Sequence, residues 1–456
     1  MKGPKVVLIG AGSAFFGRQT IWSMVKKPAL TNGTLALVDC DKKKLGWMQA
    51  IAEKAIEATG VPLKLEVTTN RKTVLKKADF VILAFANEGV KLRGVDADIS
   101  TKHGMTMCSA DTVGPGGIMR TLREVPRQNE VLDDVKKLCP NAWVINWVNP
   151  TAAMGIAMMR NYPELNTLAL CDGPHNPRFD KQICVDAGLA KSMDKVTDAM
   201  LSRLKIRSAG VNHFNWITEL TYNGKDMIPK IVDGLKRASQ GEHIAASEKG
   251  KIRLTNHIAY QLANAMGYIP KCIWHTQEYL PYFQGHDISK KDVLTIKKWD
   301  IKVRRKWMND CWTDMREIAS GKRLEAFLAD TTADHASDII ETMWTGNGKQ
   351  YYINTRNDGA VTNMTDDAYL ELLSTVDMNG VRALPYGEIP RPLWGFMHRV
   401  LDEHELAVEA AVTCDRKTLL KAFLASMVTV SIPDAKACME ELLKKEKDYL
   451  PKKWQK

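Results

Sequence analysis

The chain has 456 residues, enough for two domains. Hydrophobic residues make up 45% and charged residues 26% of it, which excludes collagen-like, disordered and small disulfide-rich proteins. The net charge of +11 could indicate nucleic acid or an anionic ligand, but the lysines form short clusters beside acidic residues. No uncharged apolar run reaches about 18 residues. We therefore expect neither nucleic acid nor a membrane as a partner.

The nine cysteines are too few for a disulfide framework in so long a chain. The apolar run near the N-terminus leads directly into a glycine loop and lacks the small-residue tail of a signal peptide. We interpret this run as the first strand of the fold. The cysteines are then expected to be reduced thiols in a cytoplasmic protein.

The first part of the chain alternates strand and helix signals. Apolar, β-branched runs predict strands at residues 6–9, 34–38, 63–68, 80–84, 143–148 and 167–170. Helical patterns follow the first two strands, up to Lys27 and over 42–58. Such alternation predicts an α/β fold, a doubly wound parallel sheet of the Rossmann type with helices on both faces.

From about residue 195 the pattern changes. Strands are predicted at 206–211 and 216–222, helices at 251–266 and 302–319, and the C-terminal segment is strongly helical. This mixture predicts a second, α+β domain. Because no Pro/Gly linker separates the parts, we expect domains 1–195 and 196–456 to pack tightly together.

A glycine loop follows the first strand where a Rossmann fold needs its turn. Its candidate cofactor-binding residues are Gly10, Gly12, Ser13, Ala14 and Phe15. The first glycine permits a tight turn and the second leaves room for a pyrophosphate, but the usual third glycine is replaced by Phe15. Asp39 ends the second strand, where a carboxylate would bind the ribose hydroxyls of NAD and repel the 2′-phosphate of NADP. The alternative is a plain strand–helix turn with Asp39 as a helix cap.

A thiol and an imidazole follow two further predicted strands. Cys171 ends one strand, and His213 follows another in Gly-Val-Asn-His. A thiolate and an imidazole can hold a divalent transition metal and leave positions open for substrate oxygens. Their separation of 42 residues fixes no geometry, so a buried cysteine and a core histidine are compatible with the same sequence.

Five ordered motifs connect these residues. They are Ser-Ala-Asp-Thr-Val-Gly-Pro-Gly-Gly-Ile-Met-Arg at 109–120, Asn-Pro at 149–150, Cys-Asp at 171–172, Ala-Gly-Val-Asn-His at 209–213 and Arg-Asn-Asp-Gly at 356–359. Together they resemble glycoside hydrolase family 4, the NAD- and manganese-dependent glycosidases that depart from two-carboxylate hydrolysis. The resemblance runs almost end to end and is nearest to the melibiase (α-galactosidase) branch, whereas the Cys-Asp pair is similar to the phospho-α-glucosidase branch.

This resemblance implies a cofactor, a metal and a reaction. Residues 1–195 would bind NAD in an architecture like that of lactate and malate dehydrogenases, with the catalytic residues completed by 196–456. Cys171 and His213 would hold Mn or another divalent transition metal. Oxidation at sugar carbon C3 acidifies the C2 proton, after which the aglycone is eliminated, water adds and C3 is reduced again.

The resemblance also suggests the acid and the base. Asp172 matches the proposed general acid of the phospho-α-glucosidases, although it could instead cap the next helix. Relatives carry a Tyr or Asp base shortly after a Gly-Tyr-x-Pro stretch, but that Asp position holds Ile273 or Trp274 here. Tyr279 and His275 are the remaining chemically competent candidates for the C2 base, and both could equally be packing residues.

Four residues are the substrate candidates. Asp111 and Asn149 match family positions that contact sugar hydroxyls, and Asn212 adjoins the metal histidine. Arg93 resembles an arginine of the phosphoglycosidases and could bind a 6-phosphate or a sugar carboxylate. Turn formation by the Asx residues and a surface ion pair for Arg93 are the structural alternatives.

The leading hypothesis is an α-glycosidase acting on a neutral α-galactoside or α-glucoside. A 6-phospho-α-glycosidase or a uronidase of the same family is the alternative within this class. A plain NAD-dependent dehydrogenase and a non-catalytic NAD-binding sensor are the alternatives outside it. The resemblance further implies a homodimer or homotetramer.

Overall fold

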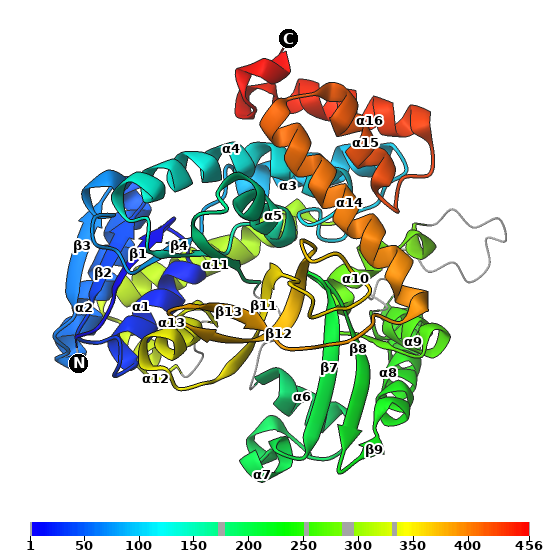
Figure 1. Cartoon of the computed structure of the whole chain (residues 1–456), viewed down its shortest axis with the longest axis horizontal. Coiled ribbons are helices and arrows are strands. Elements are labelled where there is room, and N and C mark those ends of the chain that lie inside the picture. Colours follow the sequence, from blue (N-terminus) through cyan, green and yellow to red (C-terminus); the bar gives the residue numbers. More distant parts are fainter. Residues whose placement is uncertain (1, 172–177, 250–254, 285–295, 331–334, 456) are drawn as a thin grey trace.

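The computed structural model describes residues 2–171, 178–249, 255–284, 296–330 and 335–455. The strands of these residues form a single 13-stranded sheet in the order β10-β8-β7-β12-β11-β6-β5-β4-β1-β2-β3, with β13 beside β12 and β9 beside β8 (Figure 1). The strands are β1 (Lys5–Ile9), β2 (Thr34–Val38), β3 (Lys64–Thr68), β4 (Phe80–Leu83), β5 (Trp143–Asn146), β6 (Asn166–Ala169), β7 (Leu204–Val211), β8 (Phe214–Tyr222), β9 (Lys225–Asp226), β10 (Ile269–Pro270), β11 (Gln350–Arg356), β12 (Tyr369–Asp377) and β13 (Gly380–Ala383).

Helices cover both faces of the sheet. They are α1 (Phe16–Lys26), α2 (Lys42–Thr59), α3 (Gly89–Lys102), α4 (Gly114–Leu138), α5 (Thr151–Asn161), α6 (Arg178–Asp186), α7 (Asp198–Leu201), α8 (Ile228–Lys249), α9 (Thr255–Met266), α10 (Ile273–Tyr279), α11 (Ile301–Ser320), α12 (Leu324–Ala329), α13 (His335–Thr345), α14 (Arg391–Thr413), α15 (Arg416–Ala425) and α16 (Ile432–Glu446). Within the described part of the chain, no helix is long and apolar enough to cross a membrane.

The first six strands form a parallel half-sheet. Its order, β3-β2-β1-β4-β5-β6, is the order of a Rossmann fold, and every neighbouring pair in it is parallel. All six strands coincide with the predicted ones to within one or two residues. The predicted fold class, an α/β fold built on a doubly wound parallel sheet, is confirmed.

Both faces of this half-sheet are apolar, which is why its strands appear in the sequence as continuous hydrophobic runs. On β1, Val7 and Ile9 join a core shared with α3, α4, α5 and α14. Val6 and Leu8 point the other way, into a core shared with α1, α2, α11 and α13. Because successive side chains of a strand point to opposite faces of the sheet, the residues of one apolar strand pack alternately against the two layers of helices.

The second half-sheet is antiparallel and continues the first without a break. β11 pairs with β6, and β12, β7, β8 and β10 follow in antiparallel order. The strands predicted at 206–211 and 216–222 are present as β7 and β8. β10 to β13 and helix α8 were not predicted, and the helix predicted over 251–266 is described from Thr255 onward as α9.

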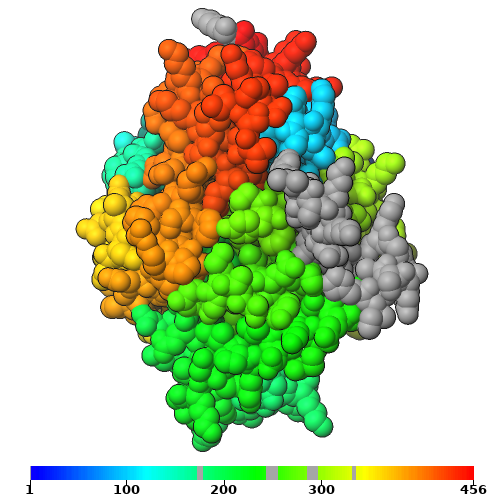
Figure 2. Space-filling model, turned by 90° about the vertical axis from the view of Figure 1, so that its right-hand side faces the viewer, coloured from blue at the N-terminus to red at the C-terminus, as the bar shows by residue number. Residues whose placement is uncertain are grey.

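The C-terminal helices pack on the parallel half through α3 and α4. Figure 2 shows them, in orange and red, at one end of the molecule, with the green segment that contains β7 and β8 at the other. Arg123 of α4 forms fully buried ion pairs with Asp96 of α3 and Glu446 of α16. Glu403 of α14 accepts a hydrogen bond of 2.6 Å from the Gly114 N–H at the start of α4.

Glu403 should make the stability of the protein depend on pH. Burial raises the pKa of this carboxyl to about 7, against the smaller opposing effect of its hydrogen bonds. The protonated form is therefore favoured in the folded state, and the stability that it contributes is lost as the pH rises through 7. Between pH 5 and 8, the free energy of unfolding of the wild type should fall by about 2 kcal/mol relative to Glu403→Gln in urea titrations.

The exposed Glu409 of the same helix supplies the control. Glu409→Gln should follow the pH profile of the wild type. A Glu403→Gln profile parallel to that of the wild type would show that this carboxyl is not protonated on folding.

Candidate active site

The loops that follow the parallel strands meet at one edge of the sheet, because the carboxyl ends of parallel strands lie together. The glycine loop follows β1, Asp39 follows β2, Asn149 follows β5 and Cys171 follows β6. The sequence therefore places most of the predicted site residues along this edge.

Close packing explains the glycines of the first loop. Gly10 has φ +95°, and a Cβ there would lie 2.5 Å from the carbonyl of Ala84. A Cβ on Gly12 would lie 2.8 Å from Asp39 Oδ2. A Cβ on Gly17 would lie 2.4 Å from the Ala11 carbonyl oxygen, so Gly17 provides the close contact between helix and loop that the usual third glycine supplies. This role of Gly17 was not predicted from the sequence.

Asp39 braces the glycine loop. Its Oδ2 accepts a hydrogen bond of 2.7 Å from the Gly12 N–H, and its Oδ1 accepts one of 2.8 Å from the Asp41 N–H. Asp41, and not Asp39, caps α2 by accepting from the N–H groups of Lys43 and Lys44. The helix-cap alternative for Asp39 was therefore wrong.

A cavity of about 680 Å³ lies in front of this loop, within the usual size range of small-molecule sites. Phe15, with 39% of its surface exposed, and Trp147 line it on the side of the parallel half-sheet. Residues of α6, α8, α9 and β10 line it on the other side. Cys171 and Lys271 also line it, so the cavity extends from Phe15 of the glycine loop to Cys171, one of the two predicted metal ligands.

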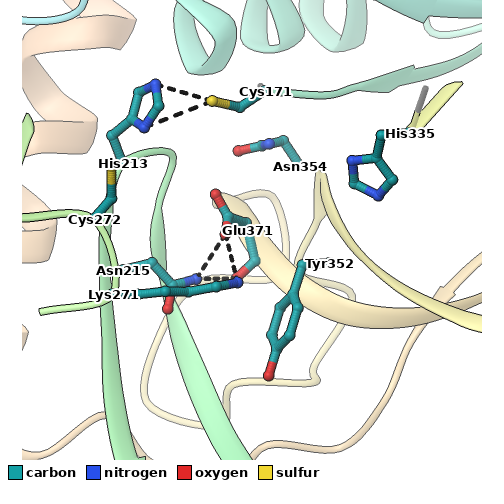
Figure 3. A pocket seen from close by; sticks show the side chains of 9 residues that line it. All are labelled: Cys171, His213, Asn215, Lys271, Cys272, His335, Tyr352, Asn354 and Glu371. Atoms are coloured by element: carbon teal, nitrogen blue, oxygen red, sulfur yellow. Dashed lines mark hydrogen bonds and ion pairs between the residues drawn. The ribbon is translucent and has the colours of Figure 1, made fainter. Parts of the chain in front are cut away.

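Cys171 and His213 come together as predicted. The Cys171 Sγ lies 3.0 Å from His213 Nε2 (Figure 3). His213 occupies the two-residue turn between β7 and β8 with φ +62°, a backbone conformation that non-glycine residues seldom adopt. Burial lowers the pKa of this imidazole well below its ordinary value, so the ring is neutral at pH 7, the form that binds metals.

Helix α10 packs against the same turn and carries both predicted base candidates. The ring of His275 stacks on that of His213, with a centroid distance of 3.7 Å and an interplanar angle of 12°. Tyr279 is only 2% exposed, stacks on Phe214 and donates a hydrogen bond of 2.8 Å to the Asn212 carbonyl. Burial raises the pKa of Tyr279 well above its ordinary value.

Asp111 lies in a buried cluster of charges. Its carboxylate pairs with Arg93 at 2.9 Å and with Arg120 at 3.0 Å. Burial alone would raise the pKa of Asp111, but these two guanidinium groups outweigh it and hold the pKa well below its usual range. Arg93 also donates to the backbone and hydroxyl oxygens of Ser109. Asn149 lies beside the cluster, with its Nδ2 3.5 Å from Asp111 Oδ2.

A second buried pair lies on the antiparallel side, and the sequence analysis did not foresee it. Lys271, 3% exposed, forms an ion pair of 3.1 Å with Glu371 and lies over the ring of Tyr352. Glu371 also accepts hydrogen bonds from the amides of Asn212 and Asn215. Figure 3 shows Lys271, Glu371, Tyr352 and Asn215 around a cavity of about 20 Å³ that Cys171 and His213 also line.

Glu278 is a further residue that the sequence analysis missed. It is fully buried, and its carboxylate accepts hydrogen bonds from the N–H groups of Cys108, Ser109 and Ala110 and from the Thr112 hydroxyl. It thereby fixes the loop that carries Asp111. Asp172, the predicted general acid, lies outside the described residues.

Replacing Glu278 by Gln should destabilise the protein. One carboxylate oxygen accepts from the three backbone N–H groups and the other from the Thr112 hydroxyl, so the amide would keep the backbone contacts only with a weaker, uncharged acceptor and would turn its NH₂ toward the Thr112 hydroxyl, which now donates. We expect a loss of about 2–4 kcal/mol in the free energy of unfolding, measured in urea at pH 7. Glu409→Gln, on an exposed helix face, is the control, and equal stabilities of the two variants would contradict this role.

Comparison of the sequence with known proteins identifies a family and related proteins that match most of the chain. The family 4 glycosyl hydrolase profile matches residues 5–185, and the family 4 glycosyl hydrolase C-terminal domain profile matches residues 208–429. An α-galactosidase from Bacillus subtilis is 28% identical over 454 residues, which cover 98% of this chain and 99% of that protein.

Two solved structures share the fold. A putative glucosidase from Bacillus subtilis superposes with a TM-score of 0.82 at 22% identity, over 97% of this chain and 100% of that one. A 6-phospho-α-glucosidase from gut microorganisms, in complex with NAD and Mn²⁺, superposes with a TM-score of 0.79 at 22% identity, over 99% of both chains. The two profiles together span most of the sequence, and the chain belongs to the family 4 glycosyl hydrolases.

Proposed function

We propose that this protein hydrolyses the α-glycosidic bond of a neutral hexoside, a galactoside or a glucoside, with NAD and a divalent metal as resident groups. The observation that carries the proposal is the contact between Cys171 and His213, 3.0 Å apart beside Asp111 and His275. Cys171 also lines the cavity that reaches the glycine loop, so one space would serve cofactor and sugar.

The residues present fit both groups. Gly10 and Gly12 allow the closely packed turn between β1 and α1 that a pyrophosphate approaches in Rossmann folds, and Asp39, directly after β2, would bind the ribose hydroxyls. A thiol and a neutral imidazole are suitable ligands for a divalent transition metal. When bound, NAD accepts and returns the C3 hydride, and the metal acts as a Lewis acid for the neighbouring sugar oxygens.

The remaining roles fall to side chains of this chain. Asp111, held ionised by its two guanidinium partners, accepts hydrogen bonds from sugar hydroxyls, and Asn149 and Asn212 position the same ring. Asp172, next to Cys171 in the sequence, protonates the departing aglycone oxygen.

His275 is the better candidate for the base that removes the C2 proton. It stacks on His213 and lies close enough to Asp111 to interact with it electrostatically. The hydroxyl of Tyr279 is buried and donates to the Asn212 carbonyl, and its raised pKa disfavours the anion that a base requires.

Arg93 favours a neutral sugar over a phosphorylated or carboxylated one. Its guanidinium already contacts Asp111 and two oxygens of Ser109. These contacts use three of the five guanidinium N–H groups, so fewer donors remain for bidentate binding of a 6-phosphate.

Assembly and compartment are parts of the same proposal. Family resemblance favours a homodimer or homotetramer, which light scattering on the purified protein would distinguish. None of the nine cysteines, all among the described residues, forms a disulfide. Because Cys171 must remain a thiol to bind a metal, a reducing compartment such as the cytoplasm suits the protein.

Release of p-nitrophenol tests the function. The substrates are the α-galactoside, the α-glucoside and the 6-phospho-α-glucoside, each with and without NAD, Mn²⁺ and a reductant, while NADH absorbance is followed. We expect hydrolysis of a neutral substrate that requires both additions and accumulates no NADH. Activity restricted to the phosphorylated substrate would refute the neutral sugar, and NADH build-up without nitrophenol would indicate a dehydrogenase.

The base assignment predicts different outcomes for two variants on the same helix. His275→Ala should lower kcat by about 10²–10⁴-fold, whereas Tyr279→Phe should keep it within severalfold of the wild type. In D₂O the wild-type product should carry deuterium at C2, and residual turnover of His275→Ala should remain slow at every pH. A large loss of kcat in Tyr279→Phe alone would assign the base to Tyr279 instead.

A further inference from the structure

Glu371 of β12 links two residues that flank His213, one of the two proposed metal ligands. Its Oε2 accepts a hydrogen bond of 3.2 Å from the side-chain amide of Asn212, and its Oε1 accepts one of 3.3 Å from that of Asn215. The same amide of Asn215 also donates to the Glu371 carbonyl, at 3.1 Å. Asn212 directly precedes His213 and Asn215 follows it by two residues, so one carboxylate holds both sides of the turn between β7 and β8.

We propose that Glu371 is a positioning residue for His213 and acts through the side chains of Asn212 and Asn215. The inference rests on the proposed function for the presence of a metal. It concerns how the protein holds an imidazole ready to bind the ion, and it is independent of which sugar is cleaved.

The backbone of the turn needs such support. His213 has φ +62°, and a non-glycine residue keeps this conformation only where the surrounding structure fixes it. Helix α10 supplies part of the support, because the Thr276 hydroxyl donates to the His213 carbonyl at 3.1 Å and the Tyr279 hydroxyl donates to the preceding carbonyl. These contacts hold backbone oxygens, whereas Glu371 holds the flanking side chains. Without the carboxylate, the turn can relax and carry the imidazole away from Cys171.

The His213 ring depends on its backbone for its direction. A histidine that binds a metal usually donates its second ring N–H to a carboxylate or a carbonyl, which fixes the ring. Among the described residues, the only hydrogen-bond partner of the His213 ring is the Cys171 thiol. The stack on His275 fixes the plane of the ring and leaves its position within that plane free. The direction of the ring nitrogens therefore follows the backbone of the turn.

Lys271 makes the burial of this carboxylate possible. Its Nζ lies 3.1 Å from Glu371 Oε1, and the two side chains are only 3% and 12% exposed (Figure 3). The Lys271 N–H also donates to the Asn215 carbonyl, at 2.9 Å, so the cation is anchored to the same hairpin. The pairing of β12 with β7, where Glu371 lies opposite Gly210, needs backbone atoms alone. A buried ion pair is costly, and the sheet itself does not require one here.

Cobalt titration of the metal-free protein, without substrate or NAD, tests the proposal. Binding is followed by the near-ultraviolet absorption of thiolate-bound Co²⁺. Glu371→Gln should bind Co²⁺ at least about tenfold more weakly than the wild type. The amide keeps one acceptor oxygen and turns its NH₂ toward a side chain that now donates.

Glu219→Gln is the matched control. Glu219 lies near the other end of the same hairpin and pairs with Lys205 and Arg207. This variant loses a carboxylate from the hairpin and leaves the turn untouched, so it should bind Co²⁺ like the wild type. Equal affinities of Glu371→Gln and Glu219→Gln would overturn the proposal.

An exchange of donor and acceptor separates positioning from a general loss of stability. Asn212→Asp alone should also weaken cobalt binding, because two carboxylates would then face each other. In the double variant with Glu371→Gln, the new amide can donate to the new carboxylate, and the affinity should return to within about threefold of the wild type. Additive losses in the double variant, or unimpaired binding in Asn212→Asp alone, would overturn the proposal.

Hydrogen exchange of the metal-free protein gives a result that needs no metal. Peptides that cover residues 209–217 should exchange faster in Glu371→Gln than in the wild type, and peptides that cover β1 should not change. Unchanged exchange around the turn would overturn the proposal.

The failures of the two proposals can be told apart. A wild type that binds cobalt and hydrolyses none of the glycosides would refute only the proposed function. Metal-dependent hydrolysis by the wild type, together with full cobalt affinity in Glu371→Gln, would refute only the role of Glu371. A wild type that binds no cobalt would refute the metal and, with it, this role.

Discussion

β6 and β11 meet through the backbones of Ala169 and Asn354, and this contact joins the parallel and antiparallel halves of the sheet. Cys171 follows β6 by two residues, whereas His213 lies in the turn after β7. The register from β11 through β12 to β7 determines how far apart these two side chains lie. Strand pairing therefore positions Cys171 and His213, the two proposed metal ligands, although 42 residues separate them in the sequence, and strand pairing is more rigid than loop closure.

Buried ion pairs and hydrogen bonds near these strands fix the positions of the side chains in the candidate site. Lys271 pairs with Glu371, Asp111 pairs with two guanidinium groups, and Glu278 accepts from several backbone N–H groups. Each of these carboxylates has partners inside the protein, because a buried charge without partners is costly. Fully connected networks of this kind fix side-chain orientations more firmly than an apolar core does.

The strands of the parallel half-sheet could be predicted from the sequence because they are buried on both faces and appear as unbroken apolar runs. β12 was missed because its sequence breaks the apolar–polar alternation of a half-buried strand, with Leu373 on the less buried face and Ser374 on the buried one, and β10 has only two residues. The roles of Cys171 and His213 depended on family resemblance, since only strand pairing brings them together.

The base could not be chosen from the sequence for a similar reason. His275 and Tyr279 are four residues apart, one helical turn, so α10 presents both to the β7–β8 turn. Only their tertiary contacts distinguish the two side chains: the ring of His275 stacks on that of His213, whereas the ring of Tyr279 stacks on that of Phe214. The burial of Glu278 could not be predicted from the sequence, since a glutamate in a polar helix is ordinarily exposed to solvent.

The two hydrogen bonds of Asp39 have a consequence for protein engineering. The usual route to an NADP-dependent enzyme exchanges this carboxylate for a neutral or basic side chain. Here that exchange would also remove the acceptor of the Gly12 and Asp41 N–H groups. The loop would then lose these two hydrogen bonds together with the carboxylate that would distinguish NAD from NADP. With the proposed role of Asp39, cofactor choice and loop rigidity would depend on one carboxylate, and a redesigned enzyme would first need another acceptor for the Gly12 N–H.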